Sequence, residues 1–131
     1  MKAPVALAAP LGLALASLMG CAAATPVDEA PVYKGAETQA LDDELVNVRV
    51  TLKGGRGAAD IDAYSRCAVA HHAQARGYGF ARHLRTNVAQ QGGLWRGDAV
   101  YTVSSERPRG LKTIDAAATL RDCGEQGIPT I

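Results

Sequence analysis

Residues 45–53 (LVNVRVTLK) alternate between apolar and polar side chains over nearly their whole length. The apolar side chains fall at Val46, Val48, Val50 and Leu52, and the positions between them are polar. Because successive side chains of a strand point to opposite faces, this pattern predicts a strand with one buried face and one solvated face. The rest of the chain must therefore provide a layer that covers one side of a sheet.

A helix is predicted to follow this strand, from Asp60 to about Arg76. Apolar residues recur along it at helical spacing, at Ile61, Tyr64, Ala68 and Ala75. Asp60 can cap its start, and Gly77 offers a left-handed stop at its end.

Two further strands are predicted at residues 78–88 and 99–103, joined as a hairpin through a turn at residues 90–93. Arg82 falls on the face of the second strand that should be buried, so it must lie at an edge or be paired. Thr113 is predicted to cap a last helix over residues 114–123, which Gly124 ends. The expected fold is a small α/β (α+β) domain over residues 45–131, ordered β-α-β-β-α, with a three-stranded antiparallel or mixed sheet and helices on one face.

The N-terminus has the composition of an export signal. Met1 and Lys2 begin it, and residues 3–19 are apolar or small except for Ser17. This run is short for a transmembrane helix, and Pro10 and Gly12 weaken it further, so a secretory signal fits better.

The end of this run resembles the lipobox of bacterial lipoproteins, because Leu18, Gly20 and Cys21 occupy matching places; Met19 is a less usual occupant of its own. The resemblance is specific over residues 1–22. In its layout of lipobox, tether and one compact domain, the whole chain is similar to small uncharacterised envelope lipoproteins of Gram-negative bacteria. It implies a signal peptide over residues 1–20, a diacylglyceryl group on Cys21 and, from Ala22, sorting to the outer membrane. The alternative is an ordinary export signal without lipid.

Residues 21–44 are predicted to form a lipidated acidic tether, because they are rich in Ala, Pro, Thr and acidic residues and lack large apolar runs. From residue 45 onward, twelve Arg and Lys residues face seven Asp and Glu residues. Ten of the twelve are Arg, which pairs readily with carboxylate and phosphate.

The basic domain favours an anionic partner, either an envelope component or a periplasmic protein, and not a nucleic acid. The candidate contacts are Arg49, Lys53, Arg85 and Arg96. The alternative is a solvated surface with no binding role.

Once the resemblance assigns Cys21 to lipid, Cys67 and Cys123 remain as a pair that is expected to form a disulfide in an oxidising compartment. An alternative is a metal site, since Cys67 and His71 stand four residues apart on the predicted helix, with Cys123 and His72 or His83 as further ligands.

No enzyme signature is present: no GxSxG elbow occurs, and Ser65 is predicted to lie on the more exposed flank of the helix. The sequence therefore predicts an outer-membrane lipoprotein, anchored by lipid and facing the periplasm, whose small domain is structural or interactive and neither catalytic nor cofactor-dependent. The alternative is a periplasmic metal-binding protein or hydrolase that uses His71, His83 and the Cys67 and Cys123 thiols.

Overall fold

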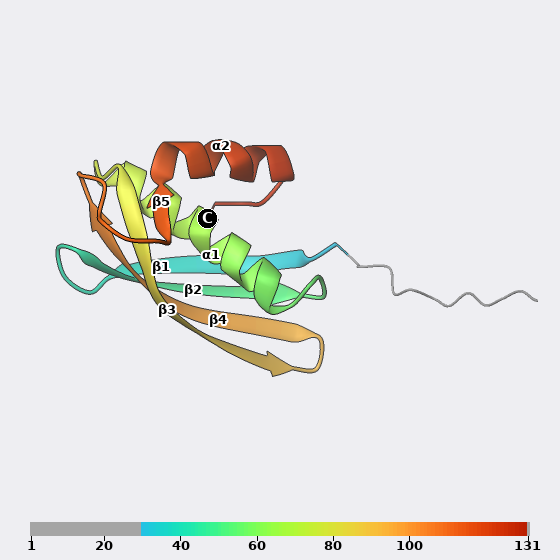
Figure 1. Ribbon diagram of the computed structural model, residues 1–131. Coiled ribbons are helices and arrows are strands. Elements are labelled where there is room, and N and C mark those ends of the chain that lie inside the picture. The colour runs from blue at the N-terminus through green and yellow to red at the C-terminus, as the bar shows by residue number, and fades with distance from the viewer. Residues whose placement is uncertain (1–29, 131) are drawn as a thin grey trace, which may run out of the picture.

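The structure, a computed structural model, describes residues 30–130 (Figure 1). The predicted signal peptide and Cys21 lie outside these residues. The elements follow in the order β1 (Val32–Ala40), β2 (Leu45–Lys53), α1 (Ala58–Ala75), β3 (Phe80–Gln91), β4 (Leu94–Ser104), β5 (Thr113–Asp115) and α2 (Ala116–Gln126).

The five strands form one antiparallel sheet in the order β1-β2-β4-β3-β5. Both helices lie on the same side of this sheet (Figure 1), and α1 contacts β1, β2, β3 and β4. The predicted three-stranded sheet is therefore wrong, because strands form at both ends of the expected domain. Within residues 30–130, the two-layer arrangement leaves the other face of the sheet without a covering element.

The first additional strand, β1, lies within the predicted tether of residues 21–44. It pairs along β2, from Val32 opposite Lys53 to Ala40 opposite Val46, with a register shift between Tyr33 and Gly35. Residues 32–40 thus belong to the folded domain, and the tether prediction is wrong over this stretch. The energetic reason is that Tyr33 and Ala36 pack against the core while the ladder satisfies the backbone groups of the segment.

Strand β2 has the faces that its alternation predicts. Val46, Val48, Val50 and Leu52 are 0–1% exposed and form the centre of the core with side chains from α1. Helix α1 begins after Gly57. The Trp95 ring packs against this glycine, so a Cβ there would collide with the indole.

Asp60 has a role other than the predicted N-cap. It lies in the first turn of α1 and is 4% exposed, and its carboxylate accepts hydrogen bonds from the backbone N–H and the guanidinium of Arg56. Burial alone would raise the pKa of this carboxyl, but the hydrogen bonds and the charge of Arg56 outweigh burial and lower it. At the other end of the helix, Gly77 adopts the predicted left-handed conformation, with φ of 84°.

Strands β3 and β4 form the predicted hairpin, but they are longer than expected and turn at Gly92. A register shift between His83 and Arg85 moves Leu84 out of the pairing, and Leu84 is 46% exposed. The inward side chains before this bulge are Ala81 and His83, so the predicted inward face is wrong up to the bulge. After the bulge, Val88 points inward and Arg85 outward, as predicted. Arg82 points away from the core and is exposed, as its charge requires.

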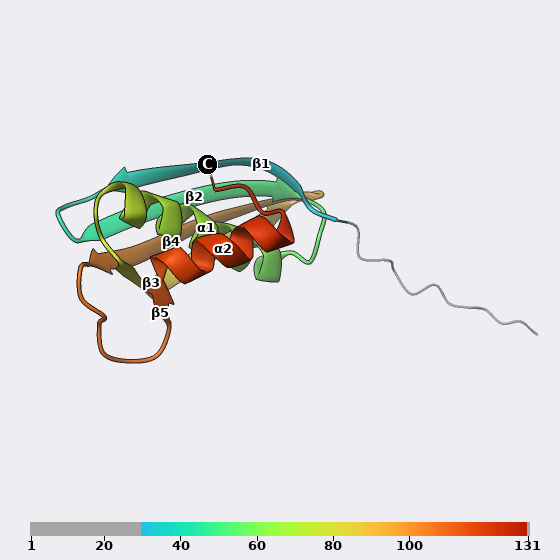
Figure 2. The same ribbon diagram turned by 90° about the horizontal axis from the view of Figure 1, so that it is seen from above.

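The last helix begins two residues later than predicted, because residues 113–115 form β5 along the first residues of β3. Asp115 rather than Thr113 caps α2, by accepting a hydrogen bond from the Ala118 N–H at 3.0 Å. The helix continues through Gly124 and ends before Gly127, and the segment that follows runs back toward β1 (Figure 2).

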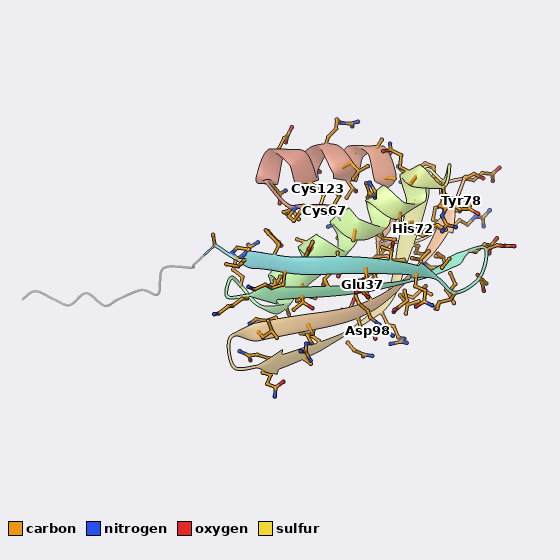
Figure 3. All side chains as sticks on the ribbon, turned by 180° about the vertical axis from the view of Figure 1, so that it is seen from behind. Glu37, Cys67, His72, Tyr78, Asp98 and Cys123 are labelled. Carbon is orange, nitrogen blue, oxygen red and sulfur yellow. A yellow bond between two sulfur atoms is a disulfide. The ribbon has the colours of Figure 1, made fainter. Side chains whose placement is uncertain are left out.

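A disulfide joins Cys67 of α1 to Cys123 of α2, as predicted, with the Cα atoms 6.0 Å apart (Figure 3). Helix α2 contacts α1 and β5, so the disulfide fixes an outer helix to the helix that covers the sheet.

Candidate interaction surface

The uncovered side of the sheet, called the open face here, consists of the side chains of β1, β2, β3 and β4 that point away from the helices. All four predicted anion-binding residues lie on it: Arg49 and Lys53 on β2, Arg85 on β3 and Arg96 on β4. The sheet order brings them together, because β4 lies between β2 and β3. They are spread over three strands and are all exposed.

The structure adds charged residues that the sequence did not single out. Arg82 of β3 lies on the same face, opposite Thr102 in register. Two acidic side chains balance Arg49: Glu37 lies opposite it on β1, and Asp98 on β4 forms a 3.9 Å contact with its Nε atom. Asp98 lies on the side of the sheet away from the helices (Figure 3).

Asp98 is also fixed by a neutral partner. The side-chain amide of Asn47 donates hydrogen bonds to the Asp98 carboxylate at 2.6 Å and to the Ala99 carbonyl at 3.1 Å. Asn47 is 8% exposed although it lies on the open face. The centre of this face is therefore an ordered polar network, whereas Lys53, Arg85 and Arg96 make no ion pair among residues 30–130.

A hollow of about 570 Å³ crosses the middle of the open face. Its charged and amide lining is made by Lys34, Glu37, Arg49, Asn87, Arg96 and Asp98. Lys53 and Arg85 lie outside this lining. The open face is thus concave, with a mixed-charge centre and an excess of cations around it.

The alternative site of His71, His83 and two thiols is not assembled. The Cys67 and Cys123 sulfurs are bonded to each other, so neither is a thiol. His83 lies on β3, where its Nε2 atom is 2.6 Å from the Thr86 hydroxyl, whereas His71 lies on α1. Within the described part of the chain, no three His, Cys, Asp or Glu side chains are grouped as a metal site requires.

The architecture defines a class: a disulfide-linked α+β domain in which two helices cover one face of a five-stranded antiparallel sheet. Residues 33–127 match the family described as the YNQ4 C-terminal domain, and the chain belongs to this family. The match begins inside β1 and ends at the left-handed Gly127 that stops α2, so it coincides with the observed domain.

A relative from Paracoccus denitrificans bears the name uncharacterized 26.9 kDa protein in the nqo8 5' region. It is 37% identical over 103 residues, which cover 74% of this chain and 40% of the relative. The chain therefore spans well under half of that protein. No solved structure matches the chain. No helix among residues 30–130 is long and apolar enough to cross a membrane.

Proposed function

We propose that the protein is a lipid-anchored envelope protein of the outer membrane, facing the periplasm, with a non-enzymatic domain that docks on anionic lipid headgroups through its open face. The observation that carries the proposal is the gathering of five cations on the open face, opposite the helices: Arg49, Lys53, Arg82, Arg85 and Arg96. The acidic side chains Glu37 and Asp98 offset only part of this charge.

The short connection to the anchor favours lipid over a distant partner. Only ten residues separate Cys21 from Val32, and an extended chain of that length spans at most about 35 Å. The strands of the sheet are of comparable length, so the open face lies within reach of the bilayer surface. Each Lys or Arg near an anionic membrane contributes about 1 kcal/mol to binding, which is sufficient to orient a domain that is already held there.

The anchor is tested by mass spectrometry of the mature protein. The expected N-terminal residue is a Cys21 that carries lipid, and Cys21→Ser is expected to release the protein from the membrane fraction. An unmodified peptide that spans Gly20 and Cys21 in the mature protein would contradict the anchor.

Docking is tested with the Cys21→Ser variant, so that the lipid does not contribute. Flotation with phosphatidylglycerol vesicles is expected, and phosphatidylcholine vesicles are expected to recruit little protein. The double variant Arg85→Glu and Arg96→Glu should lose flotation, and it should lose the most at low salt.

The matched control is Arg121→Glu, which reverses an exposed charge on α2, on the helix side of the sheet. Equal losses in the control and in the open-face variant would contradict the proposed orientation. Absence of flotation, together with photo-crosslinking from Asn87 to an acidic protein, would replace lipid by protein as the partner.

A further inference from the structure

A second hollow, separate from the open face, lies on the helix side of the sheet, where the flank of α1 meets β3 and β5. It has a volume of about 320 Å³ and is called the flank pocket here. Its lining consists of Asp62 and Arg66 from α1, His83 from β3, and Lys112, Thr113 and Ile114. This volume falls within the range of small-molecule sites.

The charges of the flank pocket favour an anion. Arg66 and Lys112 supply two cations against the single carboxylate of Asp62, and none of the three forms an ion pair within residues 30–130. A guanidinium and an ammonium that are not engaged by carboxylates are the groups that proteins use to hold phosphate or carboxylate. Asp62 can accept a hydrogen bond from a hydroxyl or amino group of the same ligand.

Two buried hydroxyls lie beside this lining. Ser65 and Tyr101 are both 0% exposed, and their hydroxyls lie close to each other. Ser65 lies between Asp62 and Arg66 on α1, which corrects its predicted place on the exposed flank. The Tyr101 ring meets the His83 ring edge to face, with centroids 5.3 Å apart.

Burial first, and then the nearby Asp62 carboxylate, raise the pKa of the Tyr101 phenol. This hydroxyl therefore stays neutral and adds no negative charge behind the pocket.

Lys112 provides an independent sign of a built site. Its φ is 67°, the one positive value at a non-glycine residue among residues 30–130. This conformation is unfavourable for a side chain with a Cβ, and such outliers concentrate at ligand sites. The Lys112 carbonyl accepts a hydrogen bond from the His83 N–H at 3.5 Å, which links the outlier to the pocket wall.

We infer that the flank pocket binds a small anionic ligand through a phosphate or carboxylate group, held by Arg66 and Lys112. This inference does not depend on docking of the open face, because the two surfaces lie on opposite sides of the sheet.

The test is an NMR titration of the ¹⁵N-labelled Cys21→Ser chain, with inorganic phosphate in one arm and succinate in the other. Sodium chloride at matched ionic strength is the control. Saturable shifts of the Arg66, Lys112 and Thr113 amides are expected in at least one arm, and the stronger arm identifies the anionic group. Shifts in both arms no larger than those with sodium chloride would overturn the inference.

Variants then assign the contacts. Arg66→Gln is expected to weaken binding by about 10-fold or more, because a charge-assisted hydrogen bond is lost. Arg121→Gln, an exposed change on α2, should leave the affinity unchanged. Equal effects of the two changes would overturn the site, since they would reflect overall charge alone.

Lys112→Gly removes both the ammonium group and the unfavourable backbone conformation, and binding and melting temperature report these two effects separately. It is expected to abolish most of the binding while raising the melting temperature, because glycine adopts a positive φ freely. Wild-type affinity in this variant would overturn the assigned contact of Lys112.

Discussion

The two faces of the sheet differ in what determines their side chains. The covered face carries side chains such as Val48 and Leu52 at 0% exposure, and packing against α1 dictates them. The open face carries charged residues such as Arg49 and Asp98, of which 64% and 46% of the side chains are exposed. The same strands thus supply most of the stability on one side and an interaction surface on the other.

The largest expected effect comes from loosening the helical layer over the covered face. Replacing both Cys67 and Cys123 by Ala removes the link between α1 and α2, which closes a separation of 56 residues. The free energy of unfolding is expected to fall by about 4 kcal/mol, mainly because the unfolded chain gains freedom. Urea denaturation at neutral pH measures the loss, and an unchanged midpoint would contradict it.

Neighbouring residues on β2 give a matched test of the two faces. Leu52→Ala on the covered face should cost about 3 kcal/mol, since it leaves a cavity in the core. Lys53→Ala on the open face should change stability by less than about 0.5 kcal/mol. Chemical denaturation of both variants measures the difference, and similar losses would show that the open face also contributes to folding.

The smallest expected effect concerns His72, where α1 meets β1. His72 is 9% exposed, and its Nδ1 atom lies 3.2 Å from the Thr38 hydroxyl. Burial first, and then the charge of Arg76 and the neighbouring His71, lower the pKa of His72 in the folded protein. The unfolded chain therefore binds more protons near pH 6, and its stability relative to the folded state changes with pH.

The stabilising contribution of neutral His72 is complete above the unfolded pKa of about 6.5 and is lost as the pH falls below that value. The free energy of unfolding is therefore expected to decrease between pH 7 and 5. His72→Gln should remove this part of the pH dependence, whereas His71→Gln should retain most of it. Thermal melts across this pH range make the comparison, and equal slopes for His72→Gln and the unsubstituted protein would contradict it.

The sequence was sufficient where large apolar residues recur at strand or helix spacing and where the cysteines could be paired. The faces of β2, the body of α1 and the disulfide are examples. Strand β1 escaped prediction because its inward side chains are mostly small or polar, such as Ala36, Thr38 and Ala40, and an edge strand requires little burial. Strand β5 is three residues long and forms only against β3, so no local signal marks it.

The candidate site was predictable to a similar extent. The alternation of β2 already places Arg49 and Lys53 on one polar face. Adding Arg85 and Arg96 requires the sheet order, which is a tertiary property. Because of the bulge after His83, the faces of β3 are opposite to the prediction over residues 80–83, so neither the place of Arg82 on the open face nor the flank pocket was foreseen.

Both interruptions of the register, at Tyr33/Gly35 and at His83/Arg85, occur in strands with an edge that is unpaired among residues 30–130. β1 ends the sheet on one side, and β5 shields only residues 80–82 of β3 on the other. An unbroken strand at such a margin is a template for recruiting further chains, and bulges with flanking charges such as Lys34 and Arg85 oppose this. The irregular backbone is thus of the kind that disfavours edge-to-edge association between crowded copies.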